Sequence, residues 1–183
     1  RVVVYANGAL MAAARVWWTF RAMGHEDVVV LDGGFEKWLS EGRPVESGPG
    51  APRRTHFRAR KRDELVADSA QVLEWSHNNA KQILDARPAA RFAGTAPEPR
   101  PGLRSGHIPG SKNLPAPNLV NPDGTLKSAA ELQAAFDAAG INVQAPFATT
   151  CGSGIAASLL ALAAARLGNW DVAIYDGSWT EWG

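Results

Sequence analysis

A single cysteine stands in a glycine-rich loop and is the residue of this chain best suited to nucleophilic chemistry. The loop reads Cys151-Gly152-Ser153-Gly154-Ile155-Ala156 and joins a β-rich run to an apolar stretch of helical length. Two glycines within four residues allow a tight curl in which successive N–H groups point at one centre. The following helix adds its N-terminal dipole, and such surroundings favour a thiolate. The loop therefore predicts a sulfur nucleophile held as an anion.

The same cysteine count excludes other kinds of site. One cysteine among 183 residues leaves no internal disulfide and no multi-cysteine metal site. The four histidines show no metal-ligand spacing. We therefore expect neither a metal nor another cofactor.

The elements that would position the loop occur twice in the chain. Residues 7–38 align with residues 151–182 without a gap, at an offset of 144. The matches include Gly8 with Gly152, Gly24 with Gly168, Asp32-Gly33 with Asp176-Gly177, and Trp38 with Trp182. Cys151 aligns with Asn7, so only the second copy carries a nucleophile.

Each copy has the pattern of a strand, a helix, a second strand and a further helix. The predicted strands are residues 2–5 and 28–31 in the first copy, and 147–150 and 172–175 in the second. The predicted helices, 9–23 and 154–167, each end at a glycine that suits a left-handed cap. Strand–helix–strand units of this length predict an α/β fold with parallel sheets covered by helices.

The two copies differ in how much sequence precedes them. Eighty-seven residues separate the second copy's cysteine from position 64, whereas six precede the equivalent Asn7. We therefore predict the second half of an inactive domain at 1–46, a linker at 47–63 and a catalytic domain at 64–183. We also expect further sequence upstream in the natural protein, because half a parallel sheet leaves apolar faces and strand edges uncovered.

These motifs together resemble the rhodanese superfamily. The loop is similar to its six-residue active loop, although the family usually has Val and Thr where this chain has Ile155 and Ala156. Further similar stretches are Gly106-His107-Ile108-Pro109-Gly110, Leu31-Asp32-Gly33-Gly34-Phe35-Glu36-Lys37-Trp38 and Tyr175-Asp176-Gly177-Ser178-Trp179-Thr180-Glu181-Trp182. The resemblance implies tandem rhodanese-like domains, the first only partly present, and sulfurtransferase activity.

The resemblance also implies a sulfur donor and a route. Thiosulfate-preferring members place basic residues directly after the cysteine, whereas Gly152 and Ser153 are neutral, which favours 3-mercaptopyruvate. Arg91 and Arg100 match the family's two substrate arginines and suit a bidentate hold on a carboxylate. Loop residues Gly152, Gly154, Ile155 and Ala156 would cradle the transferred sulfur. Sulfur would pass through a Cys151 persulfide to a thiol acceptor such as thioredoxin, or to cyanide, with Ser153 relaying a proton.

Three alternatives remain open on the sequence. The first is a thiosulfate:cyanide sulfurtransferase, and the second is a non-catalytic rhodanese module for binding or regulation. A cysteine phosphatase is disfavoured, because it needs an arginine six positions after the cysteine, where Ala157 stands.

Composition favours a small-molecule partner. The net charge of +1 gives no overall attraction to nucleic acid or membrane. The basic run at 53–62 is interpreted as a linker that is solvated or lies against acidic surface. The longest apolar run, residues 155–165, is too short to cross a bilayer, and we expect a cytoplasmic protein.

Overall fold

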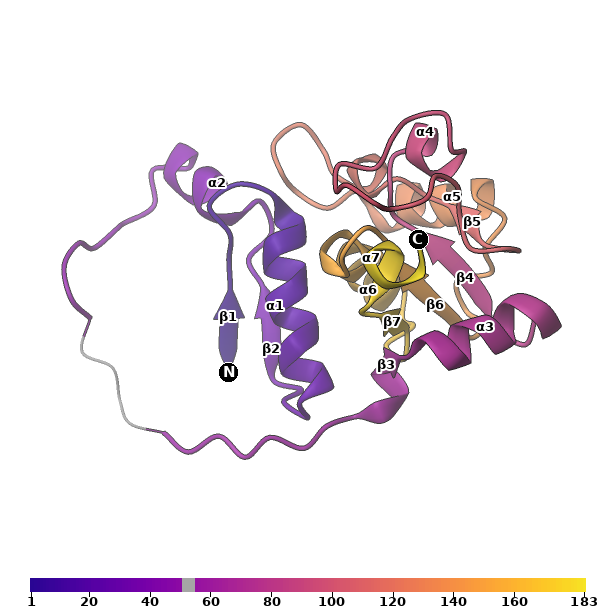
Figure 1. The fold of residues 1–183 in the computed structure, drawn as a ribbon. Coiled ribbons are helices and arrows are strands. Elements are labelled where there is room, and N and C mark those ends of the chain that lie inside the picture. The colour runs from indigo at the N-terminus through magenta and orange to yellow at the C-terminus, as the bar shows by residue number, and fades with distance from the viewer. Residues whose placement is uncertain (51–54) are drawn as a thin grey trace.

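The computed structural model describes residues 1–50 and 55–183, which form two parallel sheets with helices packed around them (Figure 1). The larger sheet has the strand order β3-β7-β6-β4-β5, and every neighbouring pair is parallel. Its strands are β3 (Val66–Ala67), β4 (Gln82–Asp85), β5 (Lys112–Asn113), β6 (Phe147–Thr150) and β7 (Ala173–Tyr175). Its helices are α3 (Ser69–Asn78), α4 (Ala89–Phe92), α5 (Ala129–Ala138), α6 (Ile155–Arg166) and α7 (Ser178–Trp182), with short 3₁₀ turns at Asp63–Leu65 and Ala116–Leu119. The α/β fold predicted from the sequence is confirmed.

The central strands of this sheet are buried on both faces. Successive residues of one strand point to opposite sides. Phe147 belongs to the cluster that includes α6, whereas its neighbour Ala148 belongs to a second cluster with Val72 of α3. Leu84 and Ile83 divide in the same way. The near-continuous apolar character of the central strands follows from this two-sided burial.

Residues 2–40, called the first half of the molecule, repeat the end of the second half, residues 63–182. It consists of β1 (Val2–Val4), α1 (Leu10–Ala22), β2 (Val28–Val30) and α2 (Gly34–Ser40), with β1 and β2 parallel. The glycines predicted to end the two long helices, Gly24 and Gly168, have φ values of 85° and 95°. The outer side of this small sheet is open, with Val3 55% and Tyr5 58% exposed.

Helices α1 and α6 pack against each other and join the two halves. They are equivalent elements of the repeat, and both are rich in alanine. Ala14 and Trp17 of α1 lie in one buried cluster with Ala157 and Ala164 of α6. Small side chains let the two backbones approach closely, so the seam between the halves is a continuous apolar core.

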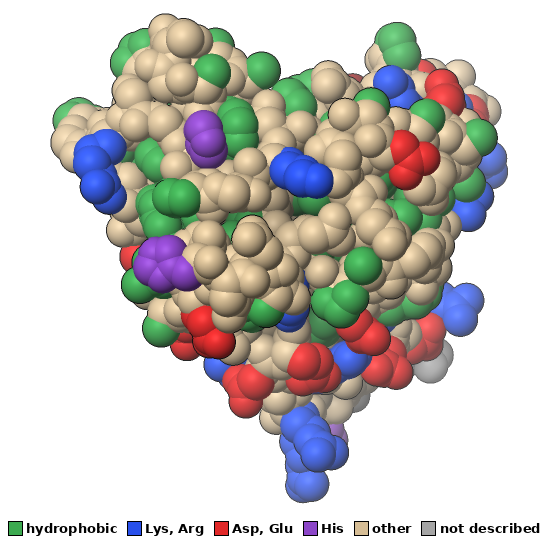
Figure 2. Space-filling model, turned by 90° about the vertical axis from the view of Figure 1, so that its right-hand side faces the viewer, with side chains coloured by type: hydrophobic (Ala, Val, Ile, Leu, Met, Phe, Trp, Pro, Cys, Tyr) green, Lys and Arg blue, Asp and Glu red, His purple; other side chains and the backbone are tan. Residues whose placement is uncertain are grey.

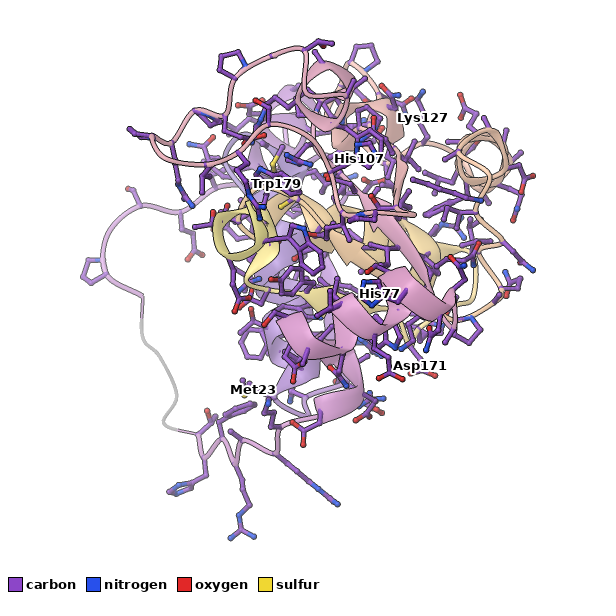
Figure 3. All side chains as sticks on the ribbon, turned by 45° about the vertical axis from the view of Figure 1, so that its right-hand side comes forward. Met23, His77, His107, Lys127, Asp171 and Trp179 are labelled. Carbon is purple, nitrogen blue, oxygen red and sulfur yellow. The ribbon has the colours of Figure 1, made fainter. Side chains whose placement is uncertain are left out.

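The segment that leads to β3 is fixed near its end to α1 and the turn that follows it. The backbone N–H of Arg60 donates to Met23 O at 2.9 Å. Met23 follows the last residue of α1 (Figure 3). The Arg62 guanidinium forms ion pairs with Glu26, Glu64 and Asp171. At the end of the basic run, Arg62 therefore lies against acidic side chains, while Arg53 and Arg54 lie outside the described residues.

The outer face of the second half carries charges of both signs. Figure 2 shows lysine and arginine side chains scattered among uncharged ones, with acidic side chains gathered toward the lower part of the view. Over residues 1–50 and 55–183, none of the helices combines the length and apolar character needed to cross a membrane.

Candidate active site

Cys151 lies directly after the carboxyl end of β6 and opens onto a cleft of about 360 Å³. In parallel α/β sheets this end of the strands is the usual place for ligands. The cysteine is only 3% exposed, so its sulfur sits at the bottom of the cleft. The wall includes Arg87, Arg91, Glu98, Arg100, Gly152, Ser153, Ile155, Ala156 and Thr180, together with Met11 from α1. Of the predicted site residues, all but Gly154 are brought together here.

The loop carbonyls are held from behind by α7. The N–H of Trp179 donates to Cys151 O at 2.9 Å, and the N–H of Thr180 donates to Gly152 O at 3.1 Å. On the cleft side of the loop, the N–H of Ser153 lies 3.4 Å from Cys151 Sγ. Helix α6 starts at Ile155 without a side-chain cap, which leaves its first amides unpaired within the helix. One amide of the predicted ring, that of Ser153, therefore contacts the sulfur, and the full ring stays a prediction.

Ser178 secures the start of the loop at the cost of an unfavourable backbone conformation. Its φ is 52°, in the left-handed region that non-glycine residues rarely adopt. Its hydroxyl donates to Tyr175 O at 2.8 Å and accepts from the N–H of Cys151 at 3.3 Å. The equivalent position of the first half is Gly34, with a φ of 61°. Serine at this position supplies the hydroxyl that glycine lacks.

Gly154 supports the loop from the side away from the cleft. Its φ is +79°, and a Cβ atom there would lie 2.5 Å from Asp176 Oδ1 and 2.9 Å from Arg15 Nη1. Arg15 and Asp176 form an ion pair that joins α1 to the end of β7. The backbone at Gly154 is thus packed against a contact between the two halves of the chain.

The two predicted donor-binding arginines both reach the cleft but are held differently. Arg91 donates from Nε and Nη2 to the Glu98 carboxylate, and a Cβ atom on Gly152 would lie 3.2 Å from Arg91 Nη2. Arg100 Nη1 donates to the hydroxyl of Thr180, which itself donates to Gly152 O at 2.6 Å. Both guanidinium groups are therefore fixed beside the loop.

A buried chain of charges runs behind Arg91. The side chain of Arg87 is 0% exposed, and it donates to Asp85 at 2.7 Å and to Glu98 at 2.7 Å. Its guanidinium also lies 4.1 Å from the Trp179 ring centre. Burial raises the pKa of Glu98, but the hydrogen bonds from Arg91 and Arg87 outweigh that effect and hold the pKa below its usual value. Glu98 is therefore an anion shared by two arginines.

The sequence reasoning missed Glu98, Thr180 and Met11. One signal for Glu98 was present, since it is the one acidic residue in a stretch that contains Arg87, Arg91 and Arg100. Met11 had no such signal, because its place depends on how α1 packs against the second half.

The histidine at this end of the molecule has a structural contact. His107 Nδ1 is 2.8 Å from Phe92 O, and the two rings stack with centroids 4.0 Å apart. Figure 3 shows His107 at the same end as Trp179. Within the part of the chain that the structure describes, no group of three or more His, Cys, Asp or Glu side chains is arranged to hold a metal ion.

Comparison with known proteins connects this site to one family. The rhodanese-like domain matches residues 1–41 and 68–183. The chain is 42% identical to 3-mercaptopyruvate sulfurtransferase of Rattus norvegicus and 47% identical to thiosulfate sulfurtransferase of Bos taurus. Each alignment covers 99% of this chain and 62% of the relative's length.

Comparison with solved structures points to the same family. The chain superposes on the crystal structure of SseA from Escherichia coli, described as a 3-mercaptopyruvate sulfotransferase, with a TM-score of 0.84 at 40% identity. That match covers 97% of this chain and 66% of the other. The predicted family is confirmed, and the chain belongs to the rhodanese-like domain family.

Proposed function

We propose that this chain carries the active half of a sulfurtransferase that moves sulfur from 3-mercaptopyruvate through a Cys151 persulfide to a thiol acceptor. The observation that carries the proposal is the placement of Cys151 at the bottom of a cleft between loop amides and two arginines. Relatives that match 99% of the chain at 42% and 47% identity are named as sulfurtransferases.

The geometry supports a two-step exchange. The Cys151 thiolate attacks the sulfur of the donor, and the sulfur–carbon bond breaks. Its electron pair passes to the carbon, which takes a proton and leaves as pyruvate. The outer persulfide sulfur would then face the Ser153 amide and the first amides of α6, which stabilise negative charge. An acceptor thiolate takes that sulfur and restores the Cys151 thiolate; cyanide would leave as thiocyanate.

The arginines and Ser153 have separate proposed roles. Arg100 supplies a planar fork for the donor carboxylate, and Arg91 donates hydrogen bonds to the donor from beside Gly152. Ser153 lines the cleft next to the sulfur, where its hydroxyl can pass on the donor's thiol proton. Gly152, Ile155 and Ala156 line the cleft as the cradle, with Gly154 supporting it from behind.

Thiosulfate is a second candidate donor. The relative named thiosulfate sulfurtransferase is 47% identical to this chain, against 42% for the relative named for 3-mercaptopyruvate. The neutral residues after the cysteine favour 3-mercaptopyruvate, since thiosulfate carries two negative charges.

Three inferences from the sequence stay predictions. They are the division into 1–46, 47–63 and 64–183, an acceptor that is a thiol such as thioredoxin or is cyanide, and a cytoplasmic location.

Intact mass spectrometry tests the function directly. After incubation with 3-mercaptopyruvate or, separately, thiosulfate, the chain should gain the mass of one sulfur atom, and cyanide or a thiol should remove it. The Cys151→Ser variant should gain nothing. A folded parent chain that gains no sulfur from either donor, or a Cys151→Ser variant that does, would contradict the proposal.

A further inference from the structure

Glu98 lies between Arg87 and Arg91 on one side of the cleft. Its carboxylate accepts from Arg87 Nη1 at 2.7 Å and from Arg91 Nε at 3.1 Å, and its side chain is only 2% exposed. Two of the three nitrogens of the Arg91 guanidinium are engaged in this contact. Among the described residues, none accepts a hydrogen bond from Arg91 Nη1, so this nitrogen keeps its donors for a ligand.

The charges in this cluster cancel. Asp85 and Glu98 are negative, Arg87 and Arg91 are positive, and they form one chain of ion pairs. Arg100 also lines the cleft, but its guanidinium donates to the hydroxyl of Thr180, which is uncharged. The three arginines of the cleft, counted together with Asp85 and Glu98, therefore carry one net positive charge, and Arg100 supplies it.

We propose that Glu98 is a positioning residue that sets the charge of the cleft. It fixes the Arg91 guanidinium over the loop and cancels the positive charge of Arg91. The cleft therefore favours donors with one negative charge over donors with two. The part of this inference that concerns donors rests on the proposed function. The part that concerns charge rests on the geometry alone. 3-Mercaptopyruvate carries one negative charge beside its thiol, whereas thiosulfate carries two. A cleft with one uncompensated cation matches the first and leaves the second half-neutralised.

Alkylation of Cys151 tests the charge without any sulfur transfer. Iodoacetate and iodoacetamide both form a bond to the cysteine sulfur and expel iodide, but only iodoacetate is an anion. The ratio of their two rate constants on the 183-residue chain reports the charge at the bottom of the cleft. A substitution that changes only the intrinsic reactivity of the sulfur alters both rate constants by the same factor and leaves the ratio unchanged.

Four variants form a charge series. Glu98→Gln should raise the iodoacetate-to-iodoacetamide ratio about tenfold, because Arg91 becomes uncompensated. Arg91→Gln should lower the ratio by about the same factor. The double variant Glu98→Gln/Arg91→Gln and the conservative variant Glu98→Asp should keep the ratio within about twofold of the parent, since both keep the net charge of the cleft. A residue with only a structural role would change both rates together and leave the ratio unchanged.

The donors provide the second measurement. In Glu98→Gln, the ratio of kcat/KM for thiosulfate to that for 3-mercaptopyruvate should rise about tenfold. A shift in the alkylation ratio with no persulfide from either donor would support the charge proposal and defeat the proposed function. Persulfide formation with equal ratios in all variants would do the reverse. If Glu98→Gln does not fold, Arg91→Gln decides, because it changes a partly exposed side chain and an unchanged ratio there overturns the proposal.

Discussion

Asp32 and Asp176 occupy equivalent positions of the internal repeat, and each accepts a hydrogen bond from the opposite half of the chain. Asp32 Oδ1 accepts from the backbone N–H of Leu126 at 2.7 Å, whereas Asp176 Oδ1 accepts from Arg15 of α1. Only the second contact lies against the cysteine loop, where Gly154 packs on it. The two aspartates therefore provide a matched pair for separating a general seam contact from one that supports the loop.

The Asp176→Asn variant should lose activity more than stability. The amide keeps the shape of the side chain but removes the charge that holds Arg15 beside Gly154, so we expect kcat to fall about tenfold. The free energy of unfolding should change by less than about 1 kcal/mol, because both partners are partly exposed to solvent. Persulfide formation rates and urea denaturation measure the two effects. Asp32→Asn is the control and should leave kcat unchanged; equal losses in both variants would contradict the assignment.

Gly154 and Gly168 both have a positive φ, so alanine variants at the two positions can separate the effect of backbone strain from that of a steric clash. Gly154→Ala should reduce activity more than a hundredfold, since the new Cβ would lie 2.5 Å from Asp176 Oδ1 and would displace the loop. Gly168 has a φ of +95° and open space around its Cβ position. Gly168→Ala should therefore cost only the backbone strain, about 1 kcal/mol in thermal or urea unfolding, and retain activity. Equal activity in the two variants would mean that the packing at Gly154 does not position the sulfur.

The Arg100→Lys variant distinguishes shape from charge at the donor site. Lysine keeps the positive charge but cannot form the planar fork, so the KM for 3-mercaptopyruvate should rise about tenfold. The KM for thiosulfate, which has no carboxylate, should change by less than about threefold. Steady-state kinetics with both donors measure this difference. Arg104 is a neighbouring arginine that donates to Trp182 O and does not line the cleft, so Arg104→Lys should alter neither value.

Tyr175 should make the fold sensitive to alkaline pH. Burial, with a contribution from Glu181, raises the pKa of Tyr175 well above its ordinary value. The folded chain therefore holds the neutral phenol, and the stability gained from it is present below about pH 10 and lost as the pH rises further.

A phenylalanine variant checks this linkage. In the described part of the chain the Tyr175 hydroxyl has no hydrogen-bond partner, so Tyr175→Phe should be at least as stable as the parent at pH 7. It should also lose less stability between about pH 9 and 11, as followed by urea unfolding at each pH. Tyr5→Phe, at a 58% exposed position, is the control. A steeper alkaline loss in Tyr175→Phe would refute the linkage.

Much of the fold could be predicted because the repeat is ungapped and its patterns are strong. The predicted strand 147–150 is β6 as observed, and the predicted helix at 154–167 differs from α6 by one residue at each end. The cysteine's place after β6 followed from the same reasoning.

Contacts between distant segments could not be predicted. The hydrogen bonds from Trp179 and Thr180 to the loop, and the Arg15–Asp176 pair, depend on how α7 and α1 pack, which no local pattern encodes. For the same reason the sequence indicated Arg91 as a donor-binding residue without indicating that Glu98 pairs with it.

The helix that begins at the reactive loop is also the helix that fastens the two halves together. A shift of α1 along α6 would act on a helix that begins at Ile155, four residues after the cysteine. Substitutions of alanines along this contact, although far from the cleft, should therefore lower the activity as well as the free energy of unfolding.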